Sequence, residues 1–238
     1  MALWGTIINA VAILAGGLLG CLLPRISDGI RRTVMQGLGL ALLVLGMTMA
    51  FKSDNILIVI GSLVLGGITG ELLKIDRGLD KMGKLLESLV NRFNRGKEGN
   101  GTVGEGFVTA TLVYCIGAMA ILGALDGGLR DNHDILYTKS MLDGISAVIF
   151  ASTLGVGVLF SSIPVFVYQG VIALSASLIT LIVDTAQLNV IIAEVTAVGG
   201  VLILGIGLNI LEIKKVNVAN LLPALFFAAL FATLTFIL

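Results

Sequence analysis

The sequence predicts an all-α membrane protein that crosses the bilayer about eight times. Of its 238 residues, 57% are hydrophobic and only 13% are charged, and its mean hydropathy is +1.05. A soluble domain usually carries about 25% charged residues, so this chain cannot supply a soluble surface. Its apolar residues form long continuous runs rich in Leu, Ile, Ala and Gly. A membrane barrel would instead show alternating segments of about ten residues.

Charged or turn-rich breaks separate the apolar runs and set the bounds of each expected span. A helix of about 20 residues crosses one bilayer. We expect spans at residues 4–23, 33–51, 55–73, 106–125, 141–160, 164–183, 190–211 and 217–238. No basic residue precedes the first run, so we expect that run to be a retained span rather than a cleaved signal peptide.

The distribution of Lys and Arg among the loops predicts the orientation of the chain. If the N-terminus lies outside, 12 of these residues fall on the cytoplasmic side and 3 on the outer side. Cytoplasmic loops normally carry this excess. We therefore expect both termini to lie outside.

The longest loop, about residues 74–105, contains an amphipathic pattern. Apolar residues recur there at spacings of three and four: Leu79, Met82, Leu85, Leu86, Leu89, Val90 and Phe93. This spacing predicts a helix lying on the inner membrane surface, which serves either as a linker or as a regulatory element. The Gly-rich segment 96–101 that follows is expected to act as a hinge.

Two internal similarities predict an inverted repeat. Asp28-Gly29-Ile30 and Asp143-Gly144-Ile145 each precede a Gly-rich span, which would relate the first three spans to the next three. Alternatively, the spacing of Gly39 and Gly46 matches that of Gly200 and Gly207, which would relate the first three spans to the last three. Both pairings are inverted, an arrangement found in many secondary transporters, and the sequence does not decide between them.

The first pairing divides the chain into consecutive blocks. These are a first repeat at residues 1–75, the amphipathic helix and linker at 76–103, a second repeat at 104–185 and a two-span hairpin at 186–238. The many glycines within the spans are expected mainly to let helices pack closely, as in Gly16-x3-Gly20 and Gly66-x3-Gly70. The alternative is a backbone exposed to a permeating solute.

Polar residues inside the spans are candidate ligands of a solute, because they are costly in lipid. The expected lining residues are Asn9, Ser152, Thr153, Asn209, Asn217 and Asn220. Asp143 and Glu194 are expected near an outer entrance that favours cations, or else as solvated residues at helix ends. Pro223 removes a backbone N–H and frees the carbonyl of Ala219, which then needs a neighbouring helix, a water or an ion.

The segment Ser152–Gly157 in the fifth expected span contains small and β-branched residues, and Ser161–Pro164 is expected to end that helix. The segment predicts either a broken helix or an intact helix with a kink. A break would expose carbonyls that coordinate ions.

Features of an enzyme or a cofactor site are nearly absent from the sequence. His133 is the only histidine and is expected to be solvated in an outer loop. No metal-ligand spacing and no phosphate-binding loop occurs, so we expect no catalytic site, cofactor or metal. The net charge is zero, which gives no reason to expect a nucleic-acid partner. Cys21 and Cys115 are expected to be buried and not disulfide-bonded.

Two terminal blocks resemble a known family. The first is Gly5-x3-Asn9 with Gly16-Gly17-x2-Gly20, and the second runs from Gly199-Gly200 through Gly207-Leu208-Asn209 to Asn217-Val218-Ala219-Asn220-Leu221-Leu222-Pro223. They resemble the YqgA/YdfK-like bacterial inner-membrane family, known as domain of unknown function 554. The resemblance covers nearly the whole chain and implies a bacterial plasma-membrane protein. It implies no activity and no site residues.

The function expected from these features is that of a secondary transporter or channel-like permease for an ion or small polar solute. The expected mechanism is movement of one repeat against the other around a site at the bilayer midplane. The alternative is a membrane scaffold or regulator that does not transport and acts through partners. The expected partners are the lipid bilayer, the solute and a second copy of the chain in a homodimer.

Overall fold

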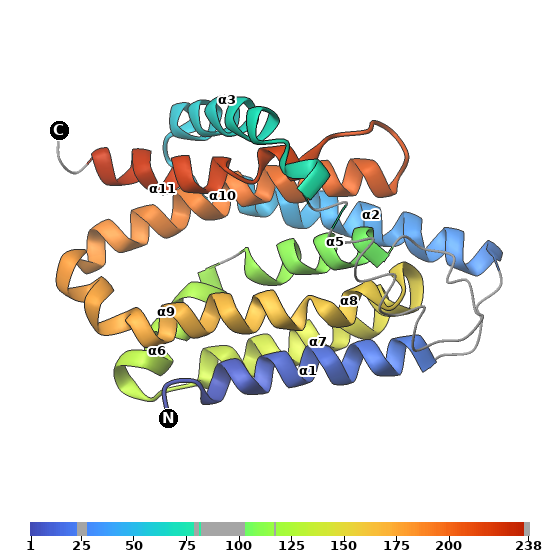
Figure 1. Ribbon diagram of the computed structural model, residues 1–238, viewed down its shortest axis with the longest axis horizontal. Coiled ribbons are helices and arrows are strands. Elements are labelled where there is room, and N and C mark those ends of the chain that lie inside the picture. Colours follow the sequence, from blue (N-terminus) through green and yellow to red (C-terminus); the bar gives the residue numbers. More distant parts are fainter. Residues whose placement is uncertain (23–27, 79–80, 82–102, 117, 236–238) are drawn as a thin grey trace. The chain divides into compact units, whose positions relative to one another are not determined.

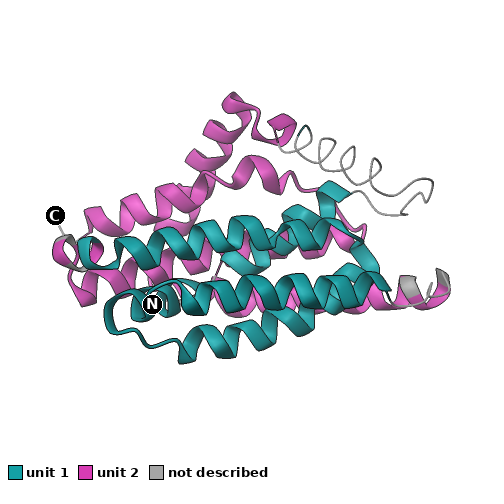
Figure 2. Cartoon of the chain, turned by 60° about the horizontal axis from the view of Figure 1, so that its bottom comes forward, with its two compact units in different colours: residues 1–27, 79–115, 119–178 teal, residues 28–78, 116–118, 179–238 magenta. Residues whose placement is uncertain are grey.

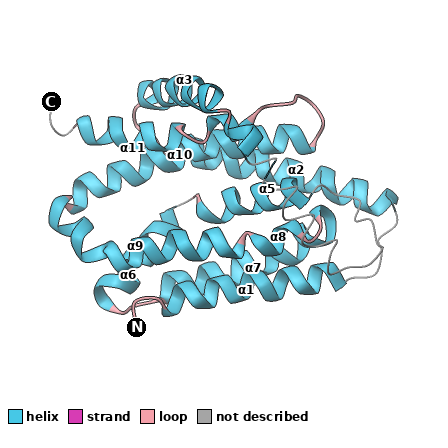
Figure 3. Ribbon diagram, in the orientation of Figure 1, coloured by secondary structure: helices cyan, strands magenta, loops and turns pink. Residues whose placement is uncertain are grey.

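The computed structural model describes residues 1–22, 28–78, 81, 103–116 and 118–235 (Figure 1). All regular structure in these residues is helical, without strands (Figure 3), which confirms the all-α class. The expected amphipathic helix at 79–93 lies, apart from Lys81, outside the described residues.

The helices follow the expected apolar runs closely. They are α1 (Trp4–Leu22), α2 (Asp28–Ala50), α3 (Ile56–Leu73), α5 (Val103–Cys115), α6 (Ala118–Arg130), α7 (Asp134–Leu154), α8 (Gly157–Phe160), α9 (Ser162–Ile182), α10 (Thr185–Ile210), the 3-10 helix η1 (Val218–Leu221) and α11 (Ala224–Leu234).

In the described part of the chain, five helices are long and apolar enough to cross a membrane, or six if the bent pair α5–α6 forms one span. The span expected at 106–125 corresponds to this pair, in which α5 and α6 meet at an angle of 59°. Helix α7 is not among the five; it is 21 residues long but carries Lys139 and Asp143 in its interior. Helix α11 has 11 residues. Eight spans therefore remain a prediction.

Of the two alternatives for the segment Ser152–Gly157, the structure shows the broken helix. Helix α7 ends at Leu154, and Gly155 has φ +84° and ψ −165°, a conformation that glycine adopts readily because it lacks a Cβ. The short helix α8 and then α9 follow. A helix does end at the segment Ser161–Pro164, because α8 ends at Phe160 with Ser161 as its C-cap, but the next helix, α9, already begins at Ser162. Pro164 lies in the first turn of α9, where a missing N–H costs no intrahelical hydrogen bond.

The chain forms two compact units that interleave along the sequence (Figure 2). Unit 1 comprises residues 1–27, 79–115 and 119–178, and unit 2 comprises residues 28–78, 116–118 and 179–238. Helices α2 and α3 therefore belong to unit 2, although they follow α1 of unit 1 directly. The units do not coincide with the consecutive blocks expected from the sequence.

In unit 1, α1 packs along α7 at glycines. A Cβ on Gly16 would overlap the carbonyl oxygen of Gly144, and a Cβ on Gly20 would overlap that of Val148. The contacts advance in the same direction along both helices, because Gly5 lies at Leu136 near the start of α7. Helices α1 and α7 are therefore parallel, and their glycines serve close packing as predicted. Cys21 near the end of α1 is exposed rather than buried, and both cysteines are free.

In unit 2, α2 packs antiparallel against α10 at the two glycine pairs with matching spacing. A Cβ on Gly46 would lie 2.7 Å from the carbonyl oxygen of Gly200, and one on Gly207 would lie 3.0 Å from that of Gly39. The matched spacing thus has a packing explanation, since the two pairs face each other. Helix α3 packs against η1 and α11 in the same way, where a Cβ on Gly70 would overlap the carbonyl oxygen of Asn220.

The two Asp-Gly-Ile triplets occupy different surroundings. A Cβ on Gly144 would lie 3.2 Å from the carbonyl oxygen of Ala12, whereas one on Gly29 would meet nothing within 4 Å. The triplets therefore do not share one packing role, and the inverted repeat remains a prediction.

Candidate solute-binding site

The interior of α7 contains an ion pair. Lys139 and Asp143 lie one helical turn apart, and they are only 7% and 6% exposed. The Lys139 Nζ donates to both carboxylate oxygens of Asp143, at 2.9 and 2.7 Å. Removing two charges from water costs several kcal/mol per ion, and their attraction offsets this only in good geometry. A charge pair in the middle of an apolar helical unit is therefore a candidate functional site.

The expected apolar run 141–160 leaves Lys139 in a loop and puts Asp143 near the start of the span. These positions within the helix are wrong, because α7 begins at Asp134, seven residues before the expected apolar run. Asp143 therefore lies at the middle of the helix. The spacing Lys139-x3-Asp143 lets each charge neutralise the other on one helix face, and this spacing is the signal that could have revealed the pair.

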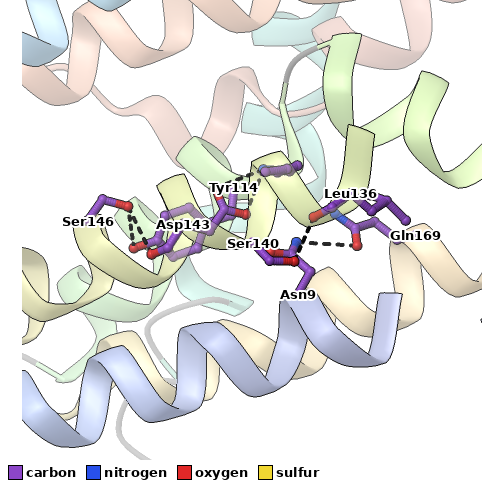
Figure 4. A network of polar contacts seen from close by, with 8 residues as sticks. Asn9, Tyr114, Leu136, Ser140, Asp143, Ser146 and Gln169 are labelled. Atoms are coloured by element: carbon purple, nitrogen blue, oxygen red, sulfur yellow. Dashed lines mark hydrogen bonds and ion pairs between the residues drawn. The ribbon is translucent and has the colours of Figure 1, made fainter. Parts of the chain in front are cut away.

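Two amide side chains from other helices lie beside this pair. Asn9 on α1 and Gln169 on α9 are both fully buried, and Asn9 Nδ2 donates to Gln169 Oε1 at 3.3 Å (Figure 4). The Asn9 side chain also lies close enough to the Asp143 carboxylate to interact with it. The structure thus brings together Asn9 and Asp143, two of the predicted site residues. Gln169 was missed, although an amide inside the apolar run 164–183 was a signal for it.

Several buried polar atoms at this cluster have no hydrogen-bond partner among the described residues. They are Asn9 Oδ1, Gln169 Nε2 and the hydroxyl of Thr6, which lies on the same face of α1 as Asn9. Each unpaired buried group costs about 1–3 kcal/mol. The cluster therefore retains unused hydrogen-bonding capacity.

Helix α5 closes another side of the cluster with Tyr114. The Ser146 hydroxyl donates to the Tyr114 hydroxyl at 3.3 Å and to the carbonyl of Asp143 at 3.0 Å (Figure 4). The Tyr114 ring centroid lies 6.0 Å from Lys139 Nζ, at the limit of a cation–π contact. We call the set Thr6, Asn9, Tyr114, Lys139, Asp143 and Gln169 the unit 1 cluster, which α1, α5, α7 and α9 form together.

Ser152 and Thr153 bond to their own helix. Their hydroxyls donate to the carbonyl of Ile149, at 2.8 and 2.9 Å, and Thr153 also donates to the carbonyl of Phe150 at 3.1 Å. Hydrogen bonds of this type satisfy a hydroxyl locally within a helix. They lie more than two turns beyond Asp143 on α7, towards the break at Gly155.

In unit 2, the predicted asparagines bond largely to the backbone. Asn209 donates to the carbonyl of Val216 at 2.9 Å and accepts from the N–H of Val216 at 2.7 Å. These two bonds close the turn that follows α10. The carbonyl of Ala219 accepts from the N–H of Leu222 at 3.2 Å. The expectation that it needs a helix, water or ion is therefore wrong, because η1 satisfies it locally.

Asn217 and Asn220 both meet the residues at the end of α3. Asn220 Oδ1 accepts from the N–H of Asp76 at 2.8 Å, and its Nδ2 donates to Glu71 Oε2 at 2.6 Å. Asn217 Nδ2 lies 3.5 Å from Asp76 Oδ2. These contacts fasten η1 to the chain that follows α3.

Glu194 on α10 is 2% exposed and accepts from the Ser53 hydroxyl at 2.7 Å. The solvated helix end that we expected as one alternative for Glu194 is wrong, because this side chain is buried. The ligand role of each predicted site residue remains a prediction.

His133 is buried rather than solvated, with 7% of its surface exposed. It precedes the first turn of α7, and its ring fits there because Gly5 and Gly127 leave space for it. Beside it, the N-terminal ammonium of Met1 bonds to exposed Asp131 and lowers the pKa of that carboxyl. Over the described ranges, no group of three or more His, Cys, Asp or Glu side chains could hold a metal ion.

Residues 4–233 match the family model described as "Protein of unknown function (DUF554)". The chain is 36% identical over 228 residues to "Uncharacterized membrane protein YdfK" of Bacillus subtilis (strain 168), covering 94% of this chain and 93% of the relative. It is 34% identical over 225 residues to "Uncharacterized protein YqgA" of Escherichia coli (strain K12), with 94% of each covered. No solved structure matches the chain. With its long apolar helices and this match over nearly its full length, the chain is a membrane protein that belongs to the DUF554 family.

Proposed function

We propose that this protein is a secondary transporter or channel-like permease for a small polar solute in a bacterial plasma membrane, and that the unit 1 cluster binds the solute. The observation that carries the proposal is the buried Lys139–Asp143 pair beside amides with unpaired atoms. A scaffold has no need of such a cluster, because an apolar core of the same shape would be at least as stable.

Helix directions within each unit support eight alternating spans, which would place both termini on the same side of the membrane. The proposal that this side is the outer one rests on the distribution of Lys and Arg. Helix α1 runs parallel to α7, which would be the first and fifth spans, and α2 runs antiparallel to α10, which would be the second and seventh. If successive spans cross the membrane in opposite directions, the first and fifth spans must be parallel and the second and seventh must be antiparallel. The inverted repeat is part of the same proposal, and its support remains the sequence pattern.

A solute must enter a cluster whose amides are fully buried, so α7 and α9 have to move apart. The break at Gly155 lies between these helices in the chain. A glycine at such a position can absorb a large change in backbone dihedrals. The site therefore lies on two helices that can move separately.

Flux into proteoliposomes tests the proposal. The purified full chain is reconstituted and screened for uptake of radiolabelled cations, anions, polyols and amino acids. We expect one class to be taken up, and we expect Asn9→Ala to abolish its uptake. The matched control is Asn189→Ala, which changes an exposed asparagine of α10 and should leave uptake intact.

If no class is taken up, or if Asn9→Ala and Asn189→Ala transport equally well, the proposal fails. A partner protein that co-purifies in a fixed ratio, together with the absence of flux, would favour the scaffold instead.

A further inference from the structure

The unit 1 cluster contains one buried cation and one buried anion in direct contact, so its fixed charge is zero. A bare cation entering it would leave a net positive charge in an apolar interior, and a bare anion would leave a net negative one. Two unit charges 4 Å apart interact by roughly 4 kcal/mol even at an effective dielectric constant of 20. The cluster therefore disfavours a solute with net charge and favours one that brings both signs.

The unpaired polar atoms of the two amides are also balanced, with one hydrogen-bond acceptor and one donor. Asn9 Oδ1 is an acceptor without a donor, and Gln169 Nε2 is a donor without an acceptor. Turning both amides over exchanges these roles but still leaves one donor and one acceptor unused. A solute with an ammonium and a carboxylate satisfies both, and the Thr6 hydroxyl can serve either group.

We propose, resting on the proposed function, that the solute is a small zwitterion of the α-amino acid class with an uncharged side chain. Its carboxylate pairs with Lys139 and takes the Gln169 donor, while its ammonium pairs with Asp143 and takes the Asn9 acceptor. In the solute-free state Lys139 and Asp143 pair with each other. Each of them then takes the place that the solute group of the same sign occupies in the bound state. When the solute enters, the Lys139–Asp143 pair is replaced by two ion pairs with the solute, and the net charge of the site stays at zero.

The test measures uptake of a radiolabelled mixture of neutral amino acids, sodium ion and chloride ion separately, in proteoliposomes of the full chain. We expect uptake of the amino acids. Unlabelled L-alanine should compete, whereas N-acetyl-L-alanine and L-alaninamide, each lacking one charge, should compete at least about tenfold less well.

Variants of Lys139 and Asp143 test whether amino-acid uptake depends on this ion pair. Lys139→Gln or Asp143→Asn alone leaves an unpaired buried charge and is expected to impair folding, so the double variant Lys139→Gln/Asp143→Asn carries the test. It should keep the wild-type elution profile and helical content and lose amino-acid uptake. The control Thr138→Ala changes an exposed hydroxyl on α7 that bonds to its own helix, and it should retain uptake.

The outcomes separate this inference from the proposed function. Sodium or chloride flux that depends on the pair, without amino-acid uptake, overturns the zwitterion and leaves the transporter standing. Competition by L-alaninamide equal to that by L-alanine overturns the role of Lys139, and equal competition by N-acetyl-L-alanine overturns that of Asp143. Absence of flux for these three probes while another class, such as polyols, is taken up overturns the zwitterion alone, and absence of flux for every class overturns both proposals.

Discussion

Unit 1 and unit 2 use their amide side chains differently. In unit 1, Asn9 and Gln169 lie inside the helical bundle, bond to each other and leave one polar atom each unpaired. In unit 2, Asn209 bonds twice to the backbone of Val216, and Asn220 bonds to the backbone of Asp76 and to the Glu71 carboxylate. An amide that fastens a turn is fully used, whereas one left partly unpaired in the interior is available to a ligand.

Two pairs of charged residues, one in each unit, show the same contrast. Lys139 and Asp143 form an ion pair at the middle of α7, while the Glu71 and Asp76 carboxylates in unit 2 meet asparagines beside η1. A structural role accounts for the unit 2 contacts, because they satisfy helix ends. It does not account for the buried pair in unit 1, which an apolar core could replace without loss of stability.

The largest expected effect is on the stability of unit 1 when one charge of its pair is removed. Lys139→Met leaves Asp143 buried without its cation, and we expect a loss of about 3–5 kcal/mol in the free energy of unfolding. The double variant Lys139→Gln/Asp143→Asn should recover most of this loss. Thermal unfolding in detergent measures both. Equal unfolding temperatures for the single and double variants would show that the two charges are not coupled.

Glycine packing in unit 2 should be the next most sensitive feature. Gly70→Ala places a Cβ against the carbonyl oxygen of Asn220, and such overpacking costs about 1–3 kcal/mol. The control Gly37→Ala adds a Cβ that meets nothing within 4 Å, so it should be neutral or stabilise α2. Chemical unfolding compares the two. A similar loss of stability in both would mean that helix flexibility, rather than close approach, determines the need for glycine.

The contrast between the asparagines predicts opposite phenotypes. Asn209→Ala removes both bonds to Val216 and should lower stability by about 1–2 kcal/mol, while uptake per folded molecule stays near the wild-type level. Asn9→Ala should change stability by less and abolish uptake. Unfolding curves and flux measured on the same preparations decide this. Loss of uptake in Asn209→Ala at full stability would place a binding residue in unit 2.

The smallest expected effect concerns Asp131, which is exposed. Its folded-state pKa is lowered by the Met1 ammonium, so its stabilising contribution is present above the ordinary pKa of Asp, about 3.9, and is lost as the pH falls through the lowered value. Asp131→Asn should therefore lower stability slightly at neutral pH and match the wild type in strong acid. Unfolding temperatures across this pH range provide the check. A constant difference at every pH would exclude the ion pair as its cause.

Much of the architecture follows from features that are local in the chain. Hydropathy alone predicts the helical class and most helix bounds, because each apolar run must satisfy its backbone hydrogen bonds internally. The break after Leu154 could also be predicted, since Gly155 and its small neighbours weaken a helix locally. The bounds of α7 were missed because a charge pair at helical spacing resembles a loop when each charge is counted singly.

The sequence by itself therefore determined that this is a helical membrane protein with polar residues in its interior, and it singled out Asn9 and Asp143. Only the tertiary structure decided which polar residues meet. It joined Asn9 to Gln169, 160 positions away, Asn209 to the backbone of Val216, and Asn220 to the Asp76 backbone and the Glu71 carboxylate. It also showed that Gly39 and Gly46 face Gly200 and Gly207. Helix formation depends on neighbours in the chain, whereas the partner of a buried amide or glycine depends on which distant helix packs against it.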